Sequence, residues 1–121
     1  MDKKKVFLKC LLVLYIFMFD VTAFSKYDKT FFDLSIKSID GNKLELNKYK
    51  NKVVLLVNVA SYCGFTKQYN DLQKLWDLYK NKNFIVLGIP SNSFKQEKNN
   101  ENEIKEFCEV NFNINFPMTS I

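Results

Sequence analysis

Cysteine is the residue of this chain best suited to covalent chemistry, because a thiolate is a strong nucleophile near neutral pH. The 121 residues include three cysteines, Cys10, Cys63 and Cys108, and no histidine. The absence of histidine excludes Ser-His-Asp and Cys-His catalysis and any histidine-ligated metal site. Any cysteine chemistry must therefore be activated by the fold rather than by an adjacent imidazole.

Cys63 stands where a strand is expected to give way to a helix. Residues 53–60 form a nearly unbroken apolar run rich in valine. This pattern predicts a central strand that is covered on both faces. A helix is expected from about residue 66, because apolar side chains then recur at i, i+3, i+4 and i+7, at Leu72, Leu75, Trp76 and Tyr79.

This position favours a reactive thiol. Ligand sites in open α/β sheets gather beyond the carboxyl ends of the strands. The free N–H groups and the dipole at the start of the next helix stabilise a thiolate at Cys63, and Gly64 permits a tight turn there. The competing interpretation is that Cys63 is a small buried apolar residue, as many free cysteines are.

The remaining elements complete an α/β pattern. Residues 84–89 predict a second buried strand, which Pro90 ends, so that strand, helix and strand form a parallel βαβ unit. Before this unit, the apolar runs 31–36 and 44–46 flank the turn residues 40–42 and predict a hairpin. After it, Asn100 and Glu103 have the spacing of a helix cap. In that helix Ile104, Phe107 and Cys108 share one face, and Phe116 and Pro117 end the region.

Several segments resemble the glutathione peroxidase family, in the version that has cysteine in place of selenocysteine. Residues 58–66, NVASYCGFT, resemble its active-site signature, and residues 87–94, LGIPSNSF, resemble its second motif. Further similar stretches are residues 95–97, 102–108 and 116–118, so the resemblance extends over about residues 29–121. It implies a thioredoxin-like fold, of which this chain holds the N-terminal portion: a hairpin, a βαβ unit and a further helix.

The resemblance also assigns roles to three residues. Cys63 matches the peroxidatic cysteine, Gln96 the catalytic glutamine, and Cys108 the resolving cysteine that forms a disulfide with Cys63 in the family's two-cysteine members. Gln96 can donate a hydrogen bond but cannot act as an acid or base. Alternatively, Gln96 is a solvated loop residue and Cys108 a core residue. Ser91 and Ser93 replace a cysteine and a glutamine of the second motif, and a glycine is missing before Lys95.

The family's catalytic group also includes a Trp-Asn pair on a later strand, and this chain ends before that position. Trp76 is not that tryptophan, because it lies on the apolar face of the expected helix and is interpreted as a core residue. The sequence therefore resembles a member that lacks its C-terminal part, whether through a truncated gene model, a partial sequence or a genuine short form.

By this resemblance, the chain is a thiol peroxidase that reduces hydrogen peroxide or organic hydroperoxides in the response to oxidative stress. The expected partners are the peroxide substrate and a thioredoxin-like protein or glutathione as reductant, with no metal and no cofactor. One alternative is a thioredoxin-like thiol-disulfide oxidoreductase, although Thr66 stands where its Cys-x-x-Cys motif needs the second cysteine. The other is an inactive truncated fragment.

The first 23 residues have the layout of a secretory signal peptide. Three lysines precede an apolar run of residues 6–19, and small residues lead up to Ala23. The run is shorter than the roughly 18–20 residues of a membrane span and contains Lys9, so no stable span is expected. We therefore expect a domain of residues 24–121 that is secreted or periplasmic. All 18 basic residues are lysine, which is weak evidence for nucleic acid, and no such partner is expected.

Overall fold

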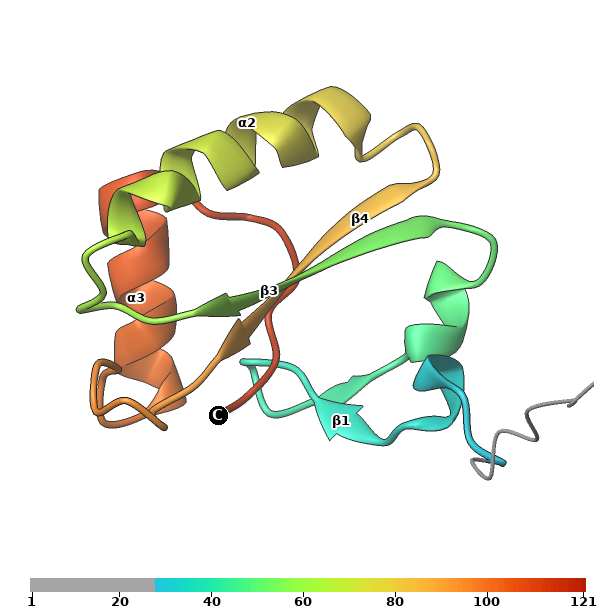
Figure 1. Cartoon of the computed structure of the whole chain (residues 1–121), viewed down its shortest axis with the longest axis horizontal. Coiled ribbons are helices and arrows are strands. Elements are labelled where there is room, and N and C mark those ends of the chain that lie inside the picture. The colour runs from blue at the N-terminus through green and yellow to red at the C-terminus, as the bar shows by residue number, and fades with distance from the viewer. Residues whose placement is uncertain (1–27) are drawn as a thin grey trace, which may run out of the picture.

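The computed structural model describes residues 28–121 of the chain, so the predicted signal peptide lies outside the described residues (Figure 1). Two strands, β3 (Val53–Val59) and β4 (Phe84–Pro90), pair in parallel over their full lengths. The helix α2 (Tyr69–Tyr79) connects them, and α3 (Glu101–Phe112) follows β4. The predicted βαβ unit and the further helix are thus confirmed.

A C-terminal segment extends the sheet beyond β4. Met118 pairs with Gly88 of β4 on one side, and Thr119 pairs with Ser38 on the other. The short antiparallel hairpin of β1 (Ile36–Lys37) and β2 (Lys43–Leu44) lies beyond Ser38. The order across the molecule is therefore β2, β1, the C-terminal segment, β4 and β3. Among the described residues, β3 has no partner on its other edge.

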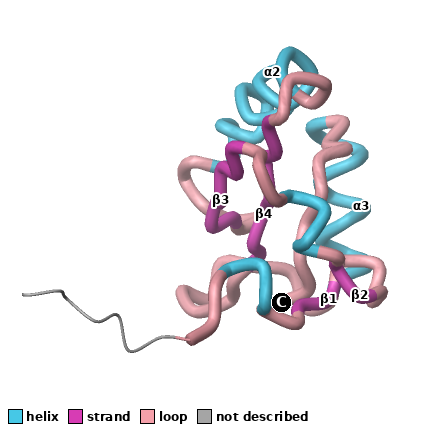
Figure 2. Tube along the Cα trace, turned by 90° about the vertical axis from the view of Figure 1, so that its right-hand side faces the viewer, coloured by secondary structure: helices cyan, strands magenta, loops and turns pink. Residues whose placement is uncertain are grey.

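Helices and hairpin cover opposite faces of the β3–β4 pair. Val59 and Val86 pack with α2 and α3 in one buried cluster, to which Ile104 and Cys108 also belong. Ile85 and Leu87 point the other way and pack with Leu46 and the hairpin. Accordingly, α2 and the hairpin lie at opposite ends of the molecule (Figures 1 and 2). Trp76 is partly buried and packs against both clusters, which confirms its interpretation as a core residue.

The hairpin differs from its prediction at both ends. Residues Phe31–Asp33 form a 3-10 helix rather than a strand. The Asp33 carboxylate caps it by accepting hydrogen bonds from both the backbone amide and the hydroxyl of Thr30. The second strand ends at Leu44, and a 3-10 helix, Leu46–Tyr49, begins where the alternation predicted more strand. Leu46 is buried, with 2 % exposed, and Phe31 is partly buried in the same cluster, so both reach the core without strand geometry.

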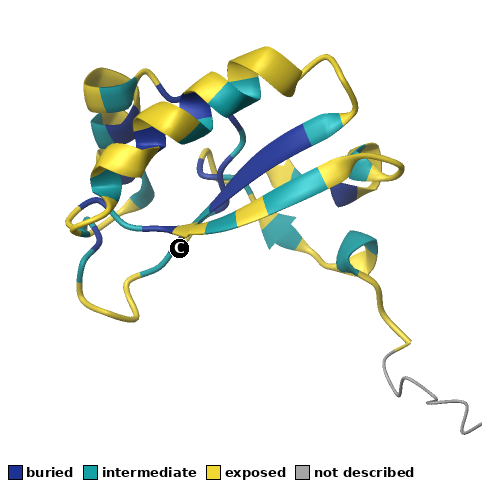
Figure 3. Ribbon diagram, turned by 45° about the horizontal axis from the view of Figure 1, so that its top comes forward, coloured by how far each residue is buried: buried dark blue, intermediate teal, exposed yellow. Residues whose placement is uncertain are grey.

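The prediction that residues 53–60 are covered on both faces is wrong for the described chain. Val53 is 66 % exposed and Leu56 is 47 % exposed, whereas Ile85, Val86 and Leu87 of β4 are buried (Figure 3). The reason is position in the sheet. β4 has neighbours at both edges, while β3 pairs with β4 alone and the hairpin reaches only its first residues, at Val54.

Two asparagines limit α3 and so determine where Cys108 lies. The Asn100 Oδ1 atom accepts a hydrogen bond from the Glu103 amide at 3.0 Å, and its Nδ2 atom donates to the Glu103 carboxylate at 2.7 Å. This is the predicted reciprocal cap. At the other end, Asn113 adopts the left-handed conformation, with φ of 53°, that ends many helices. Between the caps, Ile104 and Cys108 face the core, as predicted.

Candidate active site

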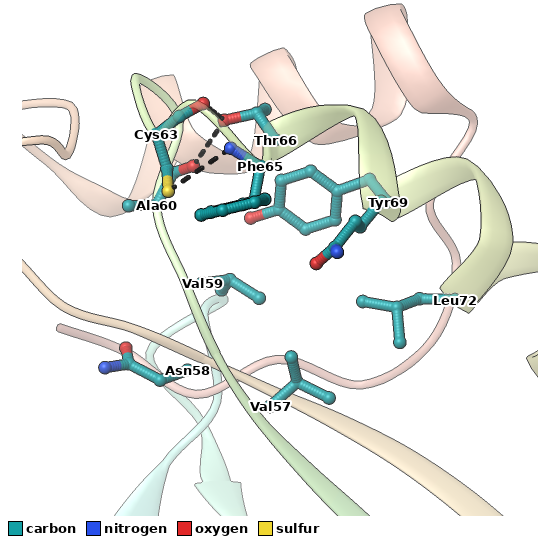
Figure 4. A pocket seen from close by; sticks show the side chains of 10 residues that line it. Val57, Asn58, Val59, Ala60, Cys63, Phe65, Thr66, Tyr69 and Leu72 are labelled. Atoms are coloured by element: carbon teal, nitrogen blue, oxygen red, sulfur yellow. Dashed lines mark hydrogen bonds between the residues drawn. The ribbon is translucent and has the colours of Figure 1, made fainter.

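Cys63 lies in the turn between β3 and the first turn of the next helix, a 3-10 turn (Thr66–Gln68) that leads directly into α2. The side chain is partly buried. The backbone amide of Phe65 points at its sulfur, with an N–Sγ distance of 3.5 Å (Figure 4). A backbone N–H group at the start of the helix thus donates to the thiol sulfur.

The side chain of Thr66 holds this turn closed. Its hydroxyl donates to the carbonyl oxygen of Cys63 at 2.6 Å and lies 3.1 Å from that of Ala60, while its amide also donates to the Cys63 carbonyl. A second cysteine at this position would place a thiol where the hydroxyl now bonds to the backbone. Thr66 therefore has a structural role in the turn that is incompatible with a Cys-x-x-Cys motif.

A small cavity of about 60 Å³ opens beside Cys63. Its walls are mostly apolar and come from β3, the turn and α2: Val57, Val59, Phe65, Tyr69 and Leu72, with Asn58, Ala60, Thr66 and Gln68 completing the lining (Figure 4). A water molecule occupies about 30 Å³ of liquid. The cavity therefore has room for a small peroxide group next to the sulfur.

Two exposed aromatic residues, Tyr62 and Phe65, lie next to Cys63 in the turn. Phe65 is 72 % exposed, and Tyr62 is 59 % exposed with the Lys98 ammonium 4.6 Å from its ring centroid. Phe94, in the loop after β4, is exposed as well. The approach to Cys63 is thus apolar with a cation at one side.

The loop that carries Gln96 is tied to the Cys63 turn through its backbone. The Gln96 carbonyl accepts a hydrogen bond from the Tyr62 amide at 2.8 Å. Within residues 28–121, no hydrogen bond joins the Gln96 side chain to Cys63, and that side chain does not line the cavity. The fold therefore brings the two loops together, while the catalytic role of Gln96 stays a prediction.

Glu97 is a functional candidate that the sequence did not reveal, because a glutamate in a polar loop is ordinarily solvated. It is 6 % exposed, and its Oε1 atom accepts hydrogen bonds from the amides of Ser61, at 3.0 Å, and Lys98, at 2.8 Å. This carboxylate holds the residue that begins the Cys63 turn. Tyr69 was also missed, although it precedes Leu72 and Trp76 at the helical spacing of the apolar face.

Cys108 is on α3 and 1 % exposed. The pKa of its thiol is raised to about 11, chiefly by burial and also by the carboxylates of Glu97 and Glu109. Cys63 and Cys108 are both free thiols. The geometry thus places one thiol at an open cavity and keeps the other inside the core.

Comparison with known proteins identifies the family. The glutathione peroxidase family matches residues 31–121, and the chain belongs to this family. The chain is 46 % identical over 90 residues to the glutathione peroxidase-like peroxiredoxin 2 of Saccharomyces cerevisiae, covering 74 % of this chain and 56 % of that protein. It is 41 % identical over 92 residues to the hydroperoxy fatty acid reductase gpx1 of Synechocystis, covering 75 % and 54 %. It spans about half the length of these curated relatives.

Solved structures agree on the fold. The T. cruzi GPX1 crystal structure is 29 % identical, with a TM-score of 0.55, over 75 % of this chain and 54 % of that one. A thioredoxin domain of a Bacteroides vulgatus thiol-disulfide oxidoreductase is 18 % identical, with a TM-score of 0.54, over 71 % and 57 %. The second similarity concerns the fold alone. The predicted thioredoxin-like fold is thus confirmed.

Proposed function

We propose that the chain acts as a thiol peroxidase in which Cys63 reduces hydrogen peroxide or an organic hydroperoxide. The observation that carries this proposal is the partly buried Cys63 thiol, which receives the Phe65 amide at 3.5 Å and faces a small cavity in a glutathione peroxidase sequence. The Cys63 thiolate attacks one peroxide oxygen and the O–O bond breaks. The other oxygen takes a proton and leaves as water or alcohol, and Cys63 becomes a sulfenic acid.

The second half of the cycle returns Cys63 to the thiol. We propose that Cys108 attacks the sulfenic sulfur, which forms a Cys63–Cys108 disulfide and releases water. Disulfide geometry needs Cα atoms within roughly 7 Å, so α3 must shift or unwind near Cys108. A thioredoxin-like dithiol protein then reduces the disulfide, a role for which it is better suited than glutathione. Oxidative stress is the setting that fits this chemistry.

Apolar surroundings favour an organic hydroperoxide among the substrates. The cavity walls are mostly apolar, and the exposed ring of Phe65 belongs to them, with the exposed ring of Tyr62 next to Cys63 in the turn. One relative is named a hydroperoxy fatty acid reductase. These features support a peroxide that carries a hydrocarbon chain, with hydrogen peroxide as the smaller substrate.

The test is peroxide consumption by the purified chain with a dithiol reductant. We expect turnover with the native chain and none with Cys63→Ser, whereas Cys108→Ala should still consume one equivalent of peroxide. A chain that reduces a protein disulfide but consumes no peroxide would favour the oxidoreductase alternative. A chain inactive in both assays would support the inactive-fragment alternative.

The location of the protein is a separate proposal. The layout of residues 1–23 supports export, with cleavage after Ala23 and a secreted or periplasmic product. N-terminal sequencing of the protein from its source cells tests this, and a mature chain that still begins at Met1 would overturn it. Within residues 28–121, no helix has the length and apolar character that crossing a membrane requires.

A further inference from the structure

A buried carboxylate contacts the Cys63 turn without lining the cavity beside it. Glu97 is 6 % exposed, and within residues 28–121 no lysine forms an ion pair with it. Its Oε1 atom accepts hydrogen bonds from the amides of Ser61, at 3.0 Å, and Lys98, at 2.8 Å, whereas its Oε2 atom has no partner among the described residues. Burial of a carboxylate is costly unless the charge is paired. A carboxylate held in the interior by two amides therefore calls for an explanation.

The peptide group that begins the Cys63 turn is held at both of its polar atoms. Its carbonyl oxygen, from Ala60, lies 3.1 Å from the Thr66 hydroxyl, and its N–H group, from Ser61, donates to Glu97. A peptide group is planar and rigid, so contacts at its two opposite sides fix its orientation. That orientation sets the direction in which the chain runs from the end of β3 to Cys63.

The residues on either side of Glu97 strengthen the attachment of this loop to the turn. The Tyr62 amide donates to the Gln96 carbonyl at 2.8 Å, so two successive amides of the turn donate to two successive residues of the loop. The Lys98 ammonium lies 4.6 Å from the ring centroid of Tyr62 and 5.4 Å from that of Phe107 on α3. Glu97 is the buried residue of these three, and its side chain makes the contact with the turn.

We propose that Glu97 is a positioning residue for Cys63, whose carboxylate fixes the Ser61 amide at the start of the turn. The turn then directs the Cys63 sulfur to the cavity and brings the Phe65 amide to that sulfur. This inference rests on the proposed function. The effect of Glu97 is geometric, since a displacement of about 1 Å at a reacting group can cost on the order of 100-fold in rate. The position of the acceptor oxygen should therefore matter more than its charge.

The first experiment measures the second-order rate constant for oxidation of Cys63 by hydrogen peroxide in the full chain. Glu97→Asp keeps the charge but withdraws the carboxylate by one methylene group, so we expect oxidation to be about 10-fold slower. Glu97→Gln removes the charge but keeps an oxygen at the position of Oε1, and the Oε2 atom that it replaces has no partner to lose. This conservative variant should retain most of the rate. The matched control is Glu106→Asp, an exposed change on α3, which should behave like the native chain.

The second experiment observes the turn in the reduced protein by NMR. In Glu97→Asp the Ser61 amide should exchange with solvent about 10-fold faster, because its acceptor is withdrawn. The Phe65 amide resonance should shift as well, since that N–H group is directed at the Cys63 sulfur. Both amides should be close to native in Glu97→Gln. Equal oxidation rates in the Asp and Gln variants would overturn the proposal, and so would faster Ser61 exchange with an unmoved Phe65 resonance.

These measurements separate the two proposals. If peroxide fails to oxidise Cys63 in the native chain, the proposed function is wrong. The NMR experiment then still decides whether Glu97 positions the turn, because it needs no peroxide. If Glu97→Asp fails to fold, Glu97→Gln decides alone, since a rate about 10-fold below native in this folded variant would overturn the proposal.

Discussion

Cys63 lies in a turn at the end of a strand and is partly exposed, whereas Cys108 lies within α3 and is 1 % exposed. The first thiol has a backbone amide directed at its sulfur and a cavity beside it. The second is surrounded by apolar side chains, and burial raises its pKa to about 11. The comparison shows that the fold leaves one cysteine accessible beside a cavity and buries the other in the core.

The sequential order of events follows from this difference. Under the proposed function, the accessible thiol beside the cavity is the one that meets the peroxide first. A buried thiol with a raised pKa remains protonated until the structure around it changes. In the proposed cycle, Cys63 therefore reacts with the peroxide, and Cys108 acts only after Cys63 has been oxidised.

The largest expected effect comes from removing the exposed thiol. Cys63→Ser should abolish peroxide reduction, because a serine hydroxyl is not ionised near neutral pH. Peroxide consumption with a dithiol reductant is the measurement, and Cys108→Ala is the matched control, which should retain the first turnover. If Cys63→Ser turned over peroxide at the native rate, Cys63 would not be the nucleophile, and the contrast between the two cysteines would be wrong.

The next effect tests whether the loop after β4 contributes a donor to the exposed thiol. Gln96→Ala should lower the peroxidase rate about 10–100-fold, or ~1.4–2.7 kcal/mol of transition-state stabilisation. Asn99→Ala, an exposed change in the same loop, is the control and should leave the rate unchanged. Equal rates for both variants would mean that Gln96 connects the loops through its backbone alone.

The buried thiol can be examined through the pH dependence of stability. Because the folded-state pKa of Cys108 is raised from 9.0 to about 11, the folded protein holds this proton more tightly than the unfolded chain does. The contribution of this proton to stability is complete below about pH 9, and the free energy of unfolding should fall by about 3 kcal/mol as the pH rises from about 9 to about 11.

Denaturant unfolding at several pH values measures this fall. Tyr69, whose pKa is also raised by burial, adds to the fall above about pH 10. Cys108→Ala should remove the Cys108 part of the fall, which runs from about pH 9 to about pH 11, and leave the Tyr69 part. If the free energy of unfolding of the native chain stayed constant between about pH 9 and pH 11, the pKa of Cys108 would not be raised by burial.

The smallest expected effect concerns the cap that places Cys108 within its helix. Asn100→Ala removes the acceptor of the Glu103 amide and should lower the free energy of unfolding by ~1 kcal/mol. Asn102→Ala, an exposed change in the first turn of α3, serves as the control and should be nearly neutral. The measurement is the thermal unfolding midpoint of both variants. Equal midpoints would mean that the core contacts of α3 hold the helix in place without help from the cap.

Local sequence patterns predicted the elements around the site well. The β3 and β4 strands, the helix after Cys63 and the Asn100 cap all followed from periodicity and capping within a few residues. The hairpin was predicted less well, because 31–36 is apolar without alternating. Its side chains reach the core from a 3-10 helix as readily as from a strand.

The sequence by itself determined the order of the elements, the place of Cys63 at the end of a strand and the inward face of α3. Each of these depends on neighbours within about one or two helical turns. Only the tertiary structure decided that β3 is half exposed, that Glu97 is buried against the Ser61 amide, and that Tyr69 lines the Cys63 cavity while its ring packs on α3. These facts depend on residues distant in the chain, and burial and electrostatic contact are properties of the packed fold that no local pattern contains.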